Sequence, residues 1–97
     1  VPRTSARAIW PVIMYPTYGV EVVFYHLAKW PPFTDEALLD EFRGRLNLIP
    51  GLEFGPESLR RRPSIKPQTL QPPAAQEAFL DALEWFLHTA QEDDRIA

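Results

Sequence analysis

Four cations that lie close together are the feature of the sequence most suited to binding chemistry. Arg60, Arg61 and Arg62 are consecutive, Lys66 follows closely, and prolines bound the segment. Arginines on an ordered loop can make bidentate contacts with phosphate or carboxylate groups. The favoured interpretation is that these arginines are solvated or pair with the acidic second helix. Two alternatives stay open, contact with an anion or nucleic acid and contact with a protein partner.

Aromatic side chains offer a second kind of contact. Trp30 follows a predicted strand, and Trp85 lies on the second predicted helix, about 140° from its apolar stripe. That position predicts that Trp85 is partly exposed or contacts another element. Together with Tyr18 and Tyr25, the two tryptophans form the predicted partner surface. Trp30, Tyr18 and Tyr25 are also suited to stacking on exposed bases.

Groups for catalysis and metal binding are sparse. The chain has no cysteine, which excludes disulfides, thiolate zinc sites and cysteine nucleophiles. The two histidines, His26 and His88, lack the spacing of a helical zinc site. No Gly-x-Ser-x-Gly motif is present, and the four glycines are scattered rather than clustered in a phosphate-binding loop. The sequence therefore predicts no catalytic residue, no metal site and no cofactor, and hence a protein that is not an enzyme.

The composition fits one small globular domain. The 97 residues are 45% hydrophobic and 24% charged, and three Trp, three Tyr and six Phe can supply a core. We expect a single domain over residues 1–97, with residues 1–7 and 92–97 flexible. The first residue is Val rather than Met, which favours a processed chain or a fragment. No long apolar run and no signal peptide is evident, so we expect a cytoplasmic protein without a membrane segment.

The charge is unevenly distributed along the chain, whose net charge is −3. Residues 1–73 hold nine Lys or Arg and seven Asp or Glu, a net charge of +2. Residues 74–97 hold one Arg and six Asp or Glu, a net charge of −5. The chain as a whole is therefore not a basic nucleic-acid binder, although one local patch could be.

Two apolar runs separated by a turn predict a β-hairpin. Ala8–Tyr15 is rich in β-forming residues, and Pro11 within it predicts a sheet edge or a bulge. Pro16–Gly19 is the predicted turn. Val20–Ala28 is the strongest predicted strand, and Trp30–Phe33 ends it because two adjacent prolines cannot continue a central strand.

Two amphipathic segments predict helices. The first has Thr34 as its N-cap, ends at a Pro-Gly pair at 50–51, and includes Gly44, whose lack of a side chain predicts close packing against the sheet. Its polar face predicts the ion pairs Asp40–Arg43 and Glu41–Arg45. The second helix is predicted to start near Pro72 and Pro73.

The segment between the two helices gives a weaker pattern. Leu52–Phe54 is suited to a short strand, Ser58–Arg62 to a single helical turn or a loop, and Pro63–Leu70 to an extended segment. The order of elements predicts an α+β fold, a two-layer sandwich. Its small, mainly antiparallel sheet would consist of a β-hairpin plus a short extended strand, covered by two helices.

Several short motifs resemble a domain found towards the ends of uncharacterised bacterial proteins. These motifs are Pro31–Phe33, Arg43–Gly51, Arg62–Ile65, Phe79–Leu80 and Glu84–Phe86. They consist of turns and core anchors and include no catalytic residue. The resemblance implies an accessory module attached to a larger bacterial chain, one that handles nucleic acid.

These features together predict a non-catalytic binding or interaction module that belongs to a larger bacterial protein or to an oligomer. The expected partner is another protein, the parent chain or a second copy, contacted around Trp30 and Trp85. The alternative is a nucleic-acid-contacting accessory domain, in which the basic loop from Arg60 to Lys66 touches phosphates. No contact with a membrane is expected.

Overall fold

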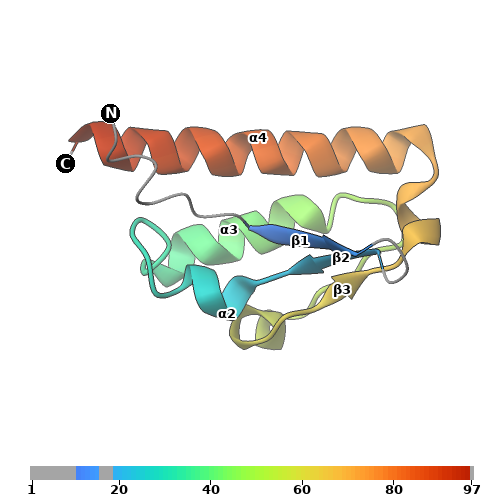
Figure 1. Ribbon diagram of the computed structural model, residues 1–97, viewed down its shortest axis with the longest axis horizontal. Helices are drawn as coiled ribbons and strands as arrows, with labels where there is room; N and C mark the ends of the chain where they lie inside the picture. The colour runs from blue at the N-terminus through green and yellow to red at the C-terminus, as the bar shows by residue number, and fades with distance from the viewer. Residues whose placement is uncertain (1–10, 16–18, 97) are drawn as a thin grey trace.

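The computed structural model describes residues 11–15 and 19–96, with side chains described as far as residue 92. Its elements are the strands β1 (Val12–Tyr15), β2 (Gly19–Val22) and β3 (Ser64–Ile65), the helices α2 (Phe24–Leu27), α3 (Glu36–Leu46) and α4 (Pro73–Ile96), and the 3₁₀ helices η1 (Pro56–Arg60) and η2 (Pro67–Leu70). The helix α4 runs along one side of the molecule, with α3 and the sheet beneath it (Figure 1). This arrangement confirms the predicted α+β fold with a hairpin and a short third strand.

The sheet is antiparallel, with the strand order β1-β2-β3. Alternate residues of a strand point to opposite faces. Val20 and Val22 of β2 and their neighbour Ile65 of β3 are buried in the core. Glu21, between the two valines, points to the opposite face, where it lies opposite Ile13 and Ser64. The sheet therefore has one apolar face that packs under the helices and one face of mixed polarity.

The second predicted strand is shorter than expected. β2 ends at Val22, whereas the sequence predicted a strand as far as Ala28. The amide of Val22 donates to the carbonyl of Pro63 at 2.8 Å, and the amide of Val23 donates to that of Pro11 at 3.0 Å. The neighbouring residue on each side is thus a proline, which accepts a hydrogen bond through its carbonyl but has no amide hydrogen to donate to β2. The ladder cannot continue beyond this point on either side.

The residues that follow form the short helix α2 instead. The amide of Leu27 donates to the carbonyl of Val23 at 3.1 Å, and the amide of Ala28 donates to that of Phe24 at 3.1 Å. The turn buries Phe24 and Leu27 completely and leaves Tyr25 and His26 exposed. Local hydrogen bonds and burial of two large side chains therefore override the β-forming composition of this segment.

The helix α3 has its N-cap one residue later than predicted. The carboxylate of Asp35, rather than the hydroxyl of Thr34, accepts a hydrogen bond from the amide of Ala37 at 3.0 Å. Two predicted ion pairs on the exposed face are confirmed, Arg43–Asp40 at 2.7 Å and Arg45–Glu41 at 2.8 Å. The predicted close packing at Gly44 is wrong, because a Cβ atom at this exposed position would meet nothing within 4 Å.

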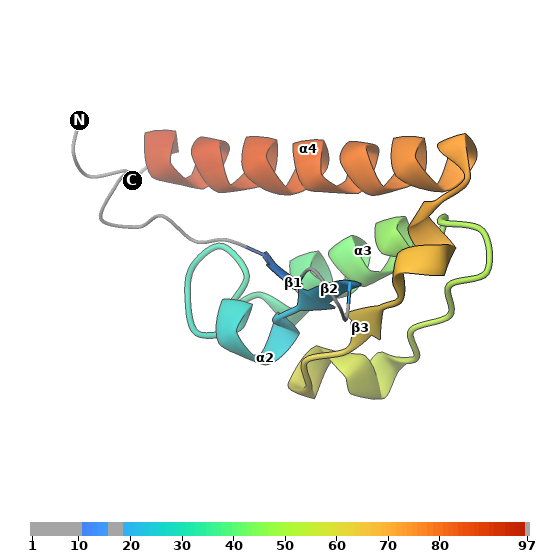
Figure 2. The ribbon, with the colours of Figure 1, turned by 45° about the vertical axis from the view of Figure 1, so that its right-hand side comes forward.

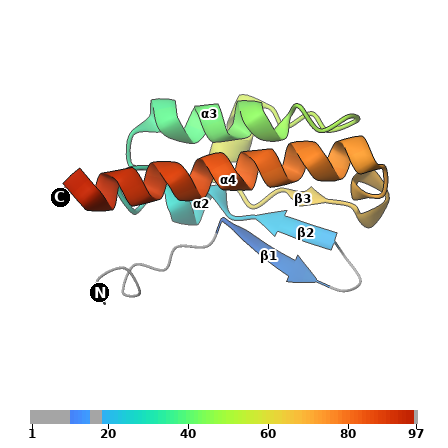
Figure 3. The same cartoon turned by 90° about the horizontal axis from the view of Figure 1, so that it is seen from above.

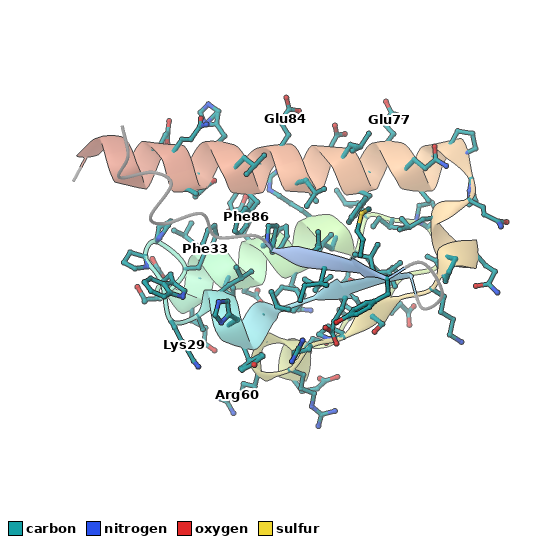
Figure 4. The ribbon with its side chains drawn as sticks, viewed as in Figure 1. Lys29, Phe33, Arg60, Glu77, Glu84 and Phe86 are labelled. Carbon is teal, nitrogen blue, oxygen red and sulfur yellow. The ribbon has the colours of Figure 1, made fainter. Side chains whose placement is uncertain are left out.

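The core lies between α3, α4 and the apolar face of the sheet. The helix α4 starts at Pro73, as predicted, and buries a stripe of residues at helical spacing: Ala75, Phe79, Ala82 and Phe86. The ring of Phe86 stacks on that of Phe33 with centroids 4.5 Å apart, and the two residues meet between α4 and the segment before α3 (Figure 4). Seen from above, α3 and α4 run side by side (Figure 3).

The segment between α3 and β3 contains no strand at Leu52–Phe54, in contrast to the prediction. Asn47 holds this segment in place: its amide nitrogen donates to the carbonyl of Phe54 at 2.9 Å, and its oxygen accepts from the Phe54 amide at 2.8 Å. The 3₁₀ helix η1 resolves the choice between a helical turn and a loop. Of the predicted extended segment Pro63–Leu70, β3 is extended and η2 is helical.

No helix among residues 11–15 and 19–96 is both long and apolar enough to span a bilayer.

Candidate partner-binding surface

The three consecutive arginines lie on a well-anchored segment. Arg60 is the last residue of η1, whose Ser58 and Leu59 are buried, and Arg61 and Arg62 follow it in extended backbone. The amide of Tyr25 donates to the carbonyl of Arg61 at 3.3 Å and so joins α2 to this segment. The chain therefore brings its most basic stretch against a helix that lies more than thirty residues earlier.

Lys29 joins this group from the turn after α2. Its ammonium group lies 5.4 Å from the centroid of the Tyr25 ring, and the guanidinium of Arg62 lies 5.7 Å from the same centroid. Lys29 and Arg60 both project from the side of the molecule formed by α2 and η1 (Figure 4). Trp30 follows Lys29 and is 45% exposed. We define the basic–aromatic surface as six exposed residues from these two segments: Tyr25, Lys29, Trp30, Arg60, Arg61 and Arg62.

Arg62 is partly neutralised within the molecule. Its guanidinium forms an ion pair with Glu21 of β2 at 2.8 Å. The hydrogen bond to Glu21 and the charge of that carboxylate raise the pKa of Arg62 above its ordinary value. Tyr15 also donates to Glu21, at 3.3 Å. Arg62 therefore stays charged and has a fixed position, but part of its binding capacity is already used.

Arg60 and Arg61 keep their full binding capacity. Both are exposed, and neither forms an ion pair with any side chain that the structure describes. The favoured interpretation of the sequence was that the arginines are solvated or pair with the acidic second helix. The pairing does not occur among the described side chains, because Glu77 and Glu84 of α4 project from the side opposite Arg60 (Figure 4).

Lys66 lies apart from the three arginines. Ser64, Ile65 and Lys66 have extended backbone, and at about 3.3 Å per residue the four-residue step from Arg62 to Lys66 covers up to roughly 13 Å. β3 lies within this interval and pairs with β2, so Lys66 lies near the turn end of the hairpin. The predicted basic loop is thus two sites rather than one.

The four predicted aromatic contact residues have different surroundings. Tyr25 and Trp30 are exposed, and Tyr25 lies beside Arg62, whereas Tyr18 lies outside the described residues. Trp85 is half-buried and contacts another element, as predicted. Its ring stacks on Phe42 of α3 at 6.3 Å, and the guanidinium of Arg45 covers it at 4.8 Å. Trp85 therefore contributes mainly to the joint between α3 and α4.

Lys29 is the functional candidate that sequence reasoning missed. Its position four residues after Tyr25 is the signal that could have found it, because residues at this spacing share one face of a helix. The prediction of a strand over Val20–Ala28 hid this signal, because residues four apart in extended backbone are roughly 13 Å from each other.

The rest of the described surface has few chemical groups that act together. Among residues 11–15 and 19–96, no three His, Cys, Asp or Glu side chains are grouped as metal ligands. His26 is exposed beside Tyr25, and His88 lies 3.9 Å from Glu92 on α4. A depression follows the loop from Asn47 to Glu57, and Glu53 and Glu57 are the acidic residues in its lining.

Comparisons with protein-family models, with curated proteins and with solved structures found no match to this chain. The resemblance to a domain at the ends of bacterial proteins therefore stays a prediction.

Proposed function

We propose that this chain is a non-catalytic interaction module that docks on an acidic surface of a partner protein. The contact would be made by the basic–aromatic surface. Trp, Tyr and Arg are the residue types most enriched among the side chains that dominate the energy of protein interfaces. The basic–aromatic surface contains one Trp, one Tyr and three Arg, all exposed, from two segments that a backbone hydrogen bond joins.

The observation that carries the proposal is that Arg60 and Arg61 are exposed on an anchored segment and form no ion pair with any described side chain. Their backbone is fixed by the burial of Ser58 and Leu59 beneath it and by the link from Tyr25 to Arg61. A contact surface that is fixed before binding loses less conformational entropy when a partner docks. Guanidinium groups held in this way are suited to bidentate contacts with the carboxylates of Asp and Glu.

The proposal is tested by titrating the chain into a fluorescein-labelled peptide rich in Asp and Glu and following fluorescence anisotropy. Arg61→Gln should weaken binding about fivefold, because it removes one fully available guanidinium. Lys66→Gln removes the same charge at a site roughly 13 Å from Arg62 and should change binding less than twofold. Equal losses in the two variants, or no binding by the unaltered chain, would overturn the proposal.

A second candidate function is contact with single-stranded nucleic acid through the same surface. The observation in its favour is that Arg60 and Arg61 have no carboxylate partner among the described side chains, and that Tyr25, an exposed ring, is joined to Arg61 through the backbone. Phosphate contact predicts affinity that falls linearly with the logarithm of the salt concentration. The same titration with a labelled oligothymidylate separates the candidates: tighter binding of the oligonucleotide than of the acidic peptide would favour this second function.

A further inference from the structure

The outward face of α4 is strongly acidic. Exposed carboxylates recur there at helical spacing, at Glu77, Asp81, Glu84 and Glu92. At 1.5 Å per residue this row is about 22 Å long. No Lys or Arg lies between Pro73 and Glu92 to neutralise it. Glu77 and Glu84 point away from the body of the molecule (Figure 4).

This acidic row and the basic–aromatic surface lie on opposite sides of the fold. Two views agree that α4 runs along one side while α2 and η1 lie on the other, with the sheet between them (Figures 1 and 2). The two surfaces are separated along the vertical axis of Figure 1, in which the molecule measures 26 Å, well beyond the Debye length of about 8 Å at physiological ionic strength. The two charged surfaces therefore cannot satisfy each other within one molecule.

We infer that the acidic face of α4 in a second copy of this chain is a partner of the basic–aromatic surface. The inference rests on the proposed function, since it gives the same surface a specific acidic occupant. It is argued from charge complementarity: one copy carries both members of the pair, and each faces solvent. The row of carboxylates on α4 would receive Arg60 and Arg61 of the neighbouring copy, with Lys29 beside them.

Such a contact is heterologous, because each copy uses two different surfaces. Every copy keeps one free surface of each kind after pairing, so copies add head to tail and the assembly grows with concentration. Exposed ion pairs contribute little individually and are screened by salt. The assembly should therefore be weak, reversible and confined to low ionic strength.

Sedimentation velocity of the full chain over a range of concentrations tests the inference. In about 0.02 M salt the weight-average mass should rise with concentration above the 11.2 kDa of the monomer. In about 0.3 M salt it should return to the monomer mass. A monomer at every concentration in low salt would overturn the inference, as would an assembly that persists unchanged in high salt.

Two neutralised variants sharpen this experiment. Arg60→Gln/Arg61→Gln removes the basic member of the pair, and Glu77→Gln/Glu84→Gln removes its acidic member. Each variant alone should be monomeric in low salt, with circular dichroism showing that both remain folded. Mixed together, they still offer one intact surface each and should form a complex of twice the 11.2 kDa monomer mass that does not grow further. Failure of the mixture to dimerise contradicts head-to-tail pairing.

Binding to the acidic peptide, measured by fluorescence anisotropy, shows whether a negative result contradicts only this inference or the proposed function as well. Glu77→Gln/Glu84→Gln should bind that peptide as the unaltered chain does, because α4 lies on the opposite side from the basic–aromatic surface. A monomeric chain that still binds the peptide through Arg61 excludes the second copy as partner and leaves the proposed function intact. If the unaltered chain is monomeric and also fails to bind the peptide, both this inference and the proposed function are overturned.

Discussion

Glycine occupies two positions with opposite requirements. Gly19, at the start of β2, has a φ of +101°, and a Cβ there would overlap the carbonyl oxygen of Ile65. Gly44 lies inside α3, has ordinary helical backbone, and has open space where a Cβ would be. The first position needs glycine for both conformation and space, whereas the second gains nothing from it.

We therefore expect alanine to act in opposite directions at these two positions. Gly19→Ala should lower the free energy of unfolding by about 1–3 kcal/mol, because it strains the backbone and pushes β3 away. Gly44→Ala should raise it by about 1 kcal/mol, because alanine is the better residue in a helix interior. Urea denaturation followed by circular dichroism measures both. Equal effects at the two positions would contradict this interpretation.

Between the elements, one side chain fixes the path of a long connection. Asn47 makes two hydrogen bonds with the backbone of Phe54, and Arg43 donates a third to the same carbonyl at 2.8 Å. These contacts hold the segment after α3 in place, so that Phe54 stays in the core. They connect the end of α3 to the start of η1 and hence to the arginines.

Asn47→Ala should lower the free energy of unfolding by about 1–3 kcal/mol, because it leaves the partly buried amide of Phe54 without its acceptor. Asn47→Asp keeps the acceptor and loses the donor, and should be less destabilising because Arg43 still donates to the Phe54 carbonyl. Urea denaturation of the unaltered chain and the two variants measures their free energies of unfolding and so gives their order of stability. An Asp variant no more stable than the Ala variant would show that the acceptor is unimportant.

The sequence was sufficient to predict the elements whose signal is local. Periodicity predicted two members of the buried stripe of α4, Phe79 and Phe86, while spacing predicted the two ion pairs of α3 and a turn between apolar runs predicted the hairpin. The end of β2 could not be predicted in this way. It depends on Pro11 and Pro63, which come to lie on either side of β2 only once the sheet has formed.

The candidate site follows the same division. The run Arg60 to Arg62 is visible in the sequence, and so is the exposure expected of Trp30. The contribution of Lys29 depends on α2, and the separation of Lys66 depends on β3, so both require the fold. The surroundings of the two tryptophans also depend on the fold. Trp85 packs against Phe42 and Arg45, whereas Trp30 has no ring contact among the described residues.

For the whole molecule, stability depends on the aromatic contacts between α4 and the rest of the core. Phe86 is fully buried and contacts both Phe33 and Phe42, with ring centroids 4.5 and 5.1 Å away. Leu87, the next residue, is 44% exposed. The two positions share a helix and differ in burial, which makes them a matched pair.

Phe86→Ala should lower the free energy of unfolding by about 3–5 kcal/mol, because it leaves a cavity at the centre of the core. Leu87→Ala should change it by no more than about 0.5 kcal/mol, because the side chain is largely solvated already. Thermal and urea denaturation measure both values. A large loss in the Leu87 variant would indicate that this exposed leucine is covered by something, as in an assembly.

The stacked pair of Phe33 and Phe86 also has a consequence for synthesis on the ribosome. More than fifty residues separate the two rings along the chain, so the first is made well before the second. Until α4 emerges, nothing covers the faces of Phe33, in the segment before α3, and Phe42, in α3, that contact Phe86, and the loop that joins them to α4 has still to close. The nascent chain therefore carries an uncovered aromatic face that a chaperone could recognise, and it loses that face in a single late step.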